Sequence, residues 1–228
     1  MSRYVPVLAL LGCYLLIPPV RVTIAGPHTE ISPTQPAKGR FLVASHRLTD
    51  PNFFETVVLL LTYEPSGAVG VIVNRPMEIR LGSVLSDIEE LRDRSDPVYL
   101  GGPVVKNLLL VLLRTAKQPE SSVAVFDGVY VSGSRAAVRD VLKKAGKRNR
   151  VRGYAGYAAW GAAQLDREIA RGDWHVTGAE ATIVFDMTAS EIWPTLIQRF
   201  SGEWTRREIR DVEEFSPRPA GLSRKMIQ

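Results

Sequence analysis

The sequence has little cysteine and little histidine, and this restricts its chemistry. It contains one cysteine, Cys13, and three histidines among 228 residues. A chain cleaved after Ala25 would have no thiol, which excludes disulfides, cysteine nucleophiles and thiolate metal sites. His46 and His175 are far apart, and no two histidines have the H-x-x-H or H-E-x-x-H spacing of a zinc site. We therefore expect neither a metal nor a cofactor.

Catalytic signatures are also scarce. The sequence has no G-x-S-x-G motif, and the glycines of residues 153–161 lack the offsets of a dinucleotide or P-loop fingerprint. Asp50, Asp166 and Glu168 have no evident partner for hydrolysis, and the last two fit the first turn of a helix, where acids interact favourably with the dipole. A metal-free hydrolase is therefore an alternative hypothesis and not the main one.

Strong charge of one sign is absent too. Lysine and arginine number 29 against 24 acids, which gives a net charge of +5. The hydrophobic share of 45% and the mean hydropathy of −0.02 are those of an ordinary globular protein. The composition excludes a histone-like or polybasic protein, and the mild basicity is only a weak indication of an anionic partner.

Residues 1–25 resemble an export signal. Arg3 precedes an apolar stretch from Tyr4 to Val20, and Thr-Ile-Ala stands before Gly26. Prolines interrupt the stretch, so the sequence does not predict a permanent membrane helix. We expect export to the periplasm or cell envelope. Two alternatives stay open: an acylated Cys13 at the end of a lipobox-like run, or a mis-set start that would leave a cytoplasmic protein.

The rest of the chain reads as one domain. Residues 26–38, rich in proline, predict a flexible linker, residues 39–214 a single folded domain, and residues 215–228 a loose tail. β-branched, apolar and turn residues predict strands at 40–45, 56–64, 68–74, 98–105, 108–114, on either side of Asp127-Gly128, from 151, at 174–177 and at 181–186. Apolar spacing and caps predict helices at 80–91, 135–145, 162–171 and 190–200. Pro76 is expected to end the first ladder.

Four landmarks in this order resemble the YqgE/AlgH family of bacterial proteins. They are GRFLVAS with the following LTDPNFFETVVLLLTYEPSGAVGVIVNRP, then YLGGPV, then GYAAWGAAQLDREIARGDW, then IVFD with EIW. The resemblance implies an α/β (α+β) single domain of mixed, bent sheets that form a pseudo-barrel with helices outside. It brings a regulator label for some members, but no established activity, catalytic residue or cofactor. Members usually read G-Y-A-G-W-x-P-G-Q-L where this chain has Ala159, Ala162 and Ala163.

Two candidate sites follow from the sequence. A ligand pocket is predicted from strand-terminating turns and from the W-G-x-x-Q-L segment, at Asn74, Arg75, Gly101, Gly102, Trp160 and Gln164. An anion or nucleic-acid patch is predicted at Arg135, Arg139, Lys143, Lys144, Lys147, Arg148, Arg150 and Arg152. In the alternative interpretation, the first set is a packing junction and the second a solvated face.

The main hypothesis is a non-catalytic binding or regulatory module for an unknown protein or a small anionic ligand. A nucleic-acid-binding regulator that uses residues 135–152 is an alternative, which export would remove. The sequence gives no indication of the oligomeric state.

Overall fold

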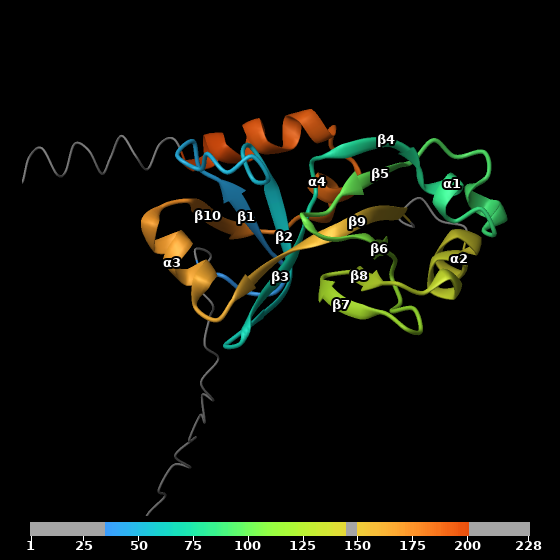
Figure 1. Ribbon diagram of the computed structural model, residues 1–228. Coiled ribbons are helices and arrows are strands. Elements are labelled where there is room, and N and C mark those ends of the chain that lie inside the picture. The colour runs from blue at the N-terminus through green and yellow to red at the C-terminus, as the bar shows by residue number, and fades with distance from the viewer. Residues whose placement is uncertain (1–34, 145–149, 201–228) are drawn as a thin grey trace, which may run out of the picture. The chain divides into compact units, whose positions relative to one another are not determined.

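The computed structural model of the protein describes residues 35–144 and 150–200, and in this part of the chain ten strands form one continuous sheet. The strand order is β10-β1-β2-β3-β9-β6-β8-β7, and the β4–β5 pair joins β9 from the side (Figure 1). The strands are β1 (Arg40–Ala44), β2 (Val57–Glu64), β3 (Gly67–Ile72), β4 (Pro76–Arg80), β5 (Pro97–Leu100), β6 (Val104–Arg114), β7 (Val123–Phe126), β8 (Val129–Ser132), β9 (Arg150–Gly161) and β10 (Trp174–Gly178). The predicted export segment, most of the linker and the C-terminal tail lie outside the described residues.

The sheet is almost entirely antiparallel and strongly curled. Among the described strands only β5 and β9 run parallel. Gly39, just before β1, lies so close to β7 that a Cβ there would be 2.8 Å from the Val125 carbonyl oxygen. The last strand in the sheet order therefore returns to the beginning of β1. This half-barrel with helices outside confirms the bent-sheet fold that the family resemblance implies.

The helices cover the sheet in two groups. They are α1 (Leu81–Val84), the 3₁₀ helix η1 (Glu89–Leu91), α2 (Arg135–Lys143), α3 (Gln164–Arg171), α4 (Ala181–Phe185) and the helix over residues 189–200. The last of these crosses β1 and β2 (orange-red in Figure 1), and its Trp193 indole donates a hydrogen bond to the Ala44 carbonyl at 2.8 Å. α1, η1 and α2 enclose a second hydrophobic cluster against β5, β6 and β9.

Continuous apolar runs lie in strands that are covered on both faces, as predicted. Residues 57–61 of β2 are all buried, and so are residues 41–44 of β1. The hairpin at Asp127-Gly128 is also confirmed, with β7 and β8 paired antiparallel on either side of it. Gly128 has a φ of 69°, the left-handed conformation that such two-residue turns require.

The predicted helix at residues 80–91 is wrong as a continuous element. α1 ends at Val84 and η1 begins only at Glu89, although Leu81, Leu85, Ile88 and Leu91 are all buried as the apolar spacing predicts. Gly82 packs against the Leu91 carbonyl oxygen, which would lie 2.4 Å from a Cβ at that position. The segment therefore folds back on itself, and tertiary packing overrides the helical periodicity.

The β2–β3 ladder ends at Ile72 and does not reach Pro76, as predicted. Pro76 opens β4 in a new pairing with β5, because the first residue of a strand tolerates the missing N–H. One other prediction needs correction. Residues 181–186, predicted as a strand, form α4, in which the Glu180 carbonyl accepts from the amides of Ile183 and Val184. Periodicity does not separate a short, wholly buried apolar run in a strand from one in a helix.

Candidate functional site

A groove of about 690 Å³ lies between the loop that follows β1 and helix α3. Its wall is made by loop residues 47–53, the end of β9, α3 and the beginning of β10. We call it the α3 groove, and it is lined by Arg47, Leu48, Thr49, Asp50, Pro51, Phe53, Ala159, Trp160, Gln164, Glu168, Arg171, Asp173 and Trp174. The volume is within the range of sites that hold small molecules.

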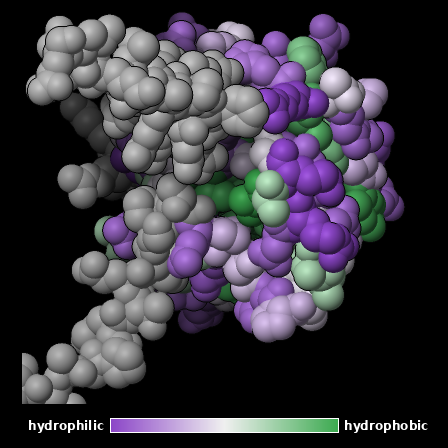
Figure 2. All heavy atoms as spheres, turned by 90° about the vertical axis from the view of Figure 1, so that its left-hand side faces the viewer, coloured by the Kyte–Doolittle hydropathy of each residue, from purple (hydrophilic) through white to green (hydrophobic). Residues whose placement is uncertain are grey.

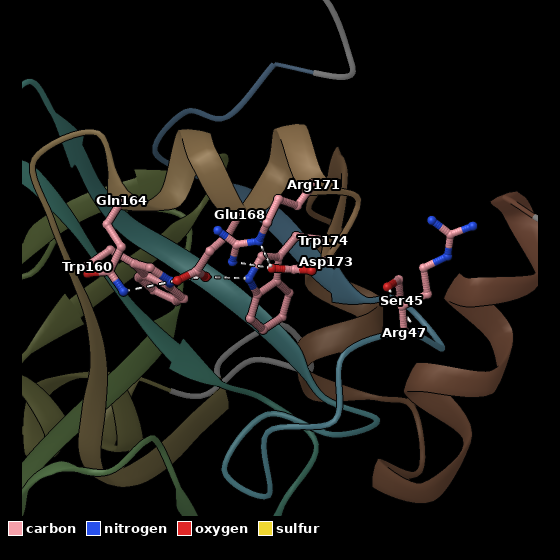
Figure 3. A network of polar contacts seen from close by, with 8 residues as sticks. All are labelled: Ser45, Arg47, Trp160, Gln164, Glu168, Arg171, Asp173 and Trp174. Carbon is pink, nitrogen blue, oxygen red and sulfur yellow. Dashed lines mark hydrogen bonds and ion pairs between the residues drawn. The ribbon is translucent and has the colours of Figure 1, made fainter.

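Glu168 organises the inner wall of the α3 groove. Its Oε2 atom accepts hydrogen bonds from the indole N–H groups of both Trp160 and Trp174, each at 2.9 Å, and Oε1 accepts from the Gln164 amide at 3.0 Å. Figure 3 shows the carboxylate between the two rings. Phe53 completes the cluster with its ring 5.9 Å from that of Trp160. One carboxylate therefore fixes two large aromatic side chains from different strands.

Helix α3 places Glu168 because both of its ends are fixed by backbone conformation. Ala163, at the N-cap, has a φ of 55°, and Gly172, at the C-cap, has a φ of 81°. The amides of Gly172 and Asp173 donate to the carbonyls of Ile169 and Glu168, at 2.9 and 3.0 Å. This is the left-handed glycine stop that the sequence predicts, and it sets Asp173 and Trp174 at the groove.

Asn74 and Arg75 do not line the α3 groove but hold the loop that forms its outer wall. The Asn74 side chain accepts from the Val57 amide and donates to the Glu55 carbonyl, both at 2.9 Å. The Arg75 guanidinium donates to the carbonyls of Pro51, Asn52 and Phe54 at 2.8 to 3.3 Å. Burial lowers the pKa of Arg75, and Asp50 offsets part of this change. These two predicted ligand contacts instead position the loop that forms the groove.

Replacing Arg75 with alanine is expected to loosen this loop. The change removes charge-assisted hydrogen bonds to three carbonyls, and we expect it to lower the free energy of unfolding by about 1–2 kcal/mol. Urea denaturation and amide exchange of residues 50–55 measure the effect. Arg80→Ala, at an exposed position of β4, is the control. Unchanged exchange in the loop of the Arg75 variant would contradict the assigned role.

Gly101 and Gly102 are not among the residues that line the α3 groove. They form the turn after β5, where the Gly101 amide donates to the Ala155 carbonyl at 2.8 Å and its carbonyl accepts from Ile72. A Cβ at Gly102 would lie 2.2 Å from the carbonyl carbon of Tyr157. These two glycines allow the turn after β5 to pack directly against the β9 backbone. Of the six predicted pocket residues, the structure therefore brings only Trp160 and Gln164 together in the groove.

The predicted basic patch is largely paired with acids. Arg135 and Arg139 both contact Asp87, and Lys144 contacts Asp140. Lys143 is exposed in the last turn of α2.

The remaining members of the predicted patch lie elsewhere. Lys147 and Arg148 are outside the described residues. Arg150 and Arg152 belong to β9 and contact Asp186 and the Tyr99 ring. Within the described part of the chain, the eight residues do not form one continuous unpaired surface.

The three acids considered for hydrolysis all have structural partners. Asp50 accepts from the amide of Asn52 at 2.8 Å, and Glu168 binds the two indoles. Asp166 accepts a hydrogen bond from the Tyr63 hydroxyl, which raises the pKa of Tyr63 to about 12. The role of Glu168 was missed because Trp174 and Phe53 meet it only in the folded protein. The four-residue spacing from Gln164 to Glu168, which places both on one helix face, was the available signal.

The comparisons with known proteins agree with this architecture. A family model described as AlgH-like matches residues 41–205. The chain belongs to the AlgH-like family. A UPF0301 protein of Xanthomonas campestris pv. campestris is 36% identical over 174 residues, which cover 75% of this chain and 92% of the relative. A UPF0301 protein of Chlorobium luteolum is 30% identical over 169 residues, which cover 74% and 88%. The family resemblance read from the sequence is thereby confirmed.

Two solved structures show the same fold. Protein DIP2367 from Corynebacterium diphtheriae superposes with a TM-score of 0.65 at 21% identity, over 75% of this chain and 91% of that one. The AlgH protein from Pseudomonas aeruginosa superposes with a TM-score of 0.57 at 27% identity, over 72% and 88%. The AlgH-like half-barrel is thus the scaffold on which the α3 groove is built.

Ala163 gives a test of local strain at the groove. The family pattern has glycine at this position, and the observed φ of 55° explains why, since a left-handed conformation costs a residue with a Cβ about 1 kcal/mol. Ala163→Gly is therefore expected to raise the free energy of unfolding by about 0.5–1 kcal/mol. Thermal and urea unfolding measure the gain. Ala162→Gly, one residue earlier, should give none, and an equal gain there would contradict the explanation.

Proposed function

We propose that this AlgH-like protein is a non-catalytic binding module whose ligand occupies the α3 groove. The observation that carries the proposal is that both walls are fixed before any ligand arrives. Glu168 ties the indoles of the inner wall, and Arg75 ties the loop of the outer wall. A concave site held in this way loses little conformational entropy on binding. A regulatory role would act through this ligand.

The lining favours a ligand of small-molecule size that carries charges of both signs. Asp50 and Arg47 line the groove with opposite charges, and Arg171 and Asp173 form an ion pair at 2.5 Å in its wall. Trp160 and Trp174 are only 5% and 2% exposed, so they form the base of the wall and leave little aromatic surface for stacking. Figure 2 shows the side of the molecule where α3 and β10 lie, and hydrophilic residues predominate on its visible part. A polar ligand fits this surface better than an apolar one.

A variant that fills the groove tests the proposal. Ala159 is exposed on β9 and lines the groove, so the indole of Ala159→Trp would block the groove. Ala159→Gly, which introduces the glycine of the family pattern, would leave the groove open. We expect amino acids, dipeptides, diamines and dicarboxylates at millimolar concentration to include compounds that raise the melting temperature of the natural protein. The rise should disappear in Ala159→Trp and persist in Ala159→Gly. Equal rises in all three proteins would contradict binding in the groove.

Nucleic-acid binding is the second candidate. The pairing of Arg135 and Arg139 with Asp87 weakens it, because a paired guanidinium releases fewer counterions on binding DNA. The test is retention of the protein on duplex DNA. Retention that falls steeply with salt and is lost in the double variant Arg150→Gln/Arg152→Gln would favour nucleic-acid binding over a ligand in the α3 groove. The metal-free hydrolase stays a prediction, tested with chromogenic esters and phosphates.

We also propose, from residues 1–25 alone, that the protein is exported. Among residues 35–144 and 150–200, no helix is both long enough and apolar enough to cross a membrane. Cell fractionation and the intact mass of the native protein test export directly. A mature chain that begins at Gly26 is the expected result, and an acylated Cys13 would indicate a lipid anchor. A cytoplasmic chain would overturn the proposal and restore the rationale for nucleic-acid binding.

A further inference from the structure

A second, smaller cavity of about 260 Å³ lies at the opposite end of β9 from the α3 groove. We call it the arginine cavity, and its wall includes Arg94, Asp96, Tyr99, Arg150 and Arg152. Arg152 and Trp160 are eight residues apart on β9, about 26 Å at the rise of an extended strand. The arginine cavity is therefore separate from the proposed ligand site.

Positive charge exceeds negative charge around this cavity. Arg94 donates two hydrogen bonds to Asp96, at 2.6 and 3.1 Å. Asp186 accepts from Arg114 at 2.7 Å and lies 3.9 Å from Arg150. Arg152 contacts neither carboxylate in these pairings. Four guanidiniums thus stand against two carboxylates, an excess equal to the charge of one dianion.

Among the described residues, Arg152 is the one of these four arginines with a buried nitrogen that lacks a well-formed hydrogen bond. Its guanidinium lies 4.5 Å from the centre of the Tyr99 ring, and its Nη2 atom is 3.5 Å from the Phe185 carbonyl oxygen. Its Nη1 atom is buried and makes no hydrogen bond of acceptable geometry within the described residues. Nη1 carries two of the five donor hydrogens of the guanidinium, so these two lack a well-formed hydrogen bond here.

Tyr154 adds a second unsatisfied group beside Arg152. The side chain is fully buried, and its hydroxyl also makes no hydrogen bond of acceptable geometry in the described part of the chain. Burial raises the pKa of Tyr154, and the charge of Arg152 and a hydrogen-bonding contact with its side chain offset part of the rise. The hydroxyl therefore stays protonated at neutral pH. The same contact places the Arg152 guanidinium next to the Tyr154 hydroxyl, although their geometry is not that of a good hydrogen bond. Buried polar atoms without a well-formed hydrogen bond are uncommon in folded proteins, and such atoms often contact a bound water or ion.

We propose that the arginine cavity binds a phosphate group, either free phosphate or the end of a small phosphomonoester. Guanidiniums bind tetrahedral oxyanions through paired N–H donors. Arg150 and Arg152 of β9 line the cavity together with Arg94, whose Nε and Nη2 atoms already donate to Asp96. A dianion matches the charge excess, whereas a water molecule would satisfy the Arg152 donor without neutralising it. The cavity has room for one phosphate with its nearest waters or a small ester substituent.

Calorimetric titration of the full-length chain with sodium phosphate, at constant ionic strength set with sodium chloride, tests this site. We expect one phosphate per chain, competition by sulfate, and none by chloride. Methyl phosphate in a parallel titration distinguishes the two sources: weaker binding than phosphate indicates the free anion, and equal or tighter binding indicates a phosphomonoester.

Matched variants separate this site from the rest of the surface. Arg152→Gln is expected to raise the dissociation constant for phosphate at least tenfold. Arg150→Gln changes a more exposed part of the same wall and should also weaken phosphate binding, so it provides the test if Arg152→Gln does not fold. Arg135→Gln on α2 is the control and should bind as the natural chain does. Absence of phosphate binding, or equal binding by all these folded proteins, would overturn the proposal. Neither result bears on the α3 groove, which Ala159→Trp tests separately.

Discussion

Gly102→Ala is expected to destabilise the protein by about 3 kcal/mol or more. The new Cβ would lie 2.2 Å from the carbonyl carbon of Tyr157, 2.3 Å from its oxygen and 2.4 Å from the Ala158 amide nitrogen. All three are backbone atoms, so no side-chain rotation relieves the clash. The β5–β6 turn would have to move away from β9, the strand that pairs with β3, β5 and β6. Urea denaturation followed by far-UV circular dichroism measures the loss.

Gly172→Ala is the matched control for Gly102→Ala. Gly172 also has a positive φ, 81°, but no atom lies within 4 Å of the position of its Cβ. The substitution therefore meets only the conformational cost, about 1 kcal/mol. If the two variants lose equal stability, close approach to the β9 backbone is not what makes Gly102 necessary. A fully stable Gly102→Ala protein would contradict the described turn.

Glu168→Ala should have the second large effect, a loss of about 2–4 kcal/mol. The substitution leaves the indole N–H groups of Trp160 and Trp174 without their acceptor, and each unsatisfied buried donor costs about 1–3 kcal/mol. The indole N–H resonances of both tryptophans should shift and broaden in the NMR spectrum, because the two rings lose their common anchor.

Two further variants serve as controls for Glu168→Ala. Glu168→Gln keeps one acceptor oxygen and should lose less stability than Glu168→Ala. Glu89→Ala removes a carboxylate that is 81% exposed, and it should stay within about 0.5 kcal/mol of the natural protein. Unchanged indole resonances in Glu168→Ala would show that the carboxylate does not hold the rings.

Local patterns were enough to predict most of the sheet. The buried runs of β1 and β2, residues 41–44 and 57–61, are apolar throughout, and the Asp-Gly and Gly172 signals correspond to conformations that the backbone adopts. Prediction failed where distant contacts decide, as at residues 80–91, where Gly82 packs on Leu91. It failed also at residues 181–186, where the buried run of residues 183–185 is too short to show the period that separates strand from helix.

The candidate site was half predictable for a related reason. Trp160 and Gln164 belong to one recognisable segment, so their role at a turn between a strand and a helix could be read from the sequence. Glu168 gains its role only when the curl of the sheet brings Trp174 and Phe53 to it. Asn74 and Arg75 were assigned to a ligand because strand-end turns bind ligands, yet here their donors and acceptors bond the main chain of residues 51–57.

The most direct test of the account is a ¹⁵N-indole NMR titration of the natural protein with the compounds that raise its melting temperature. We predict that the indole resonances of Trp160 and Trp174 shift with added compound, and that they shift further than that of Trp193, which bonds Ala44 and does not line the groove. The shifts should be absent in Ala159→Trp. Compounds that move only Trp193, or that leave all three indoles unchanged while still stabilising the protein, would contradict the α3 groove as the binding site.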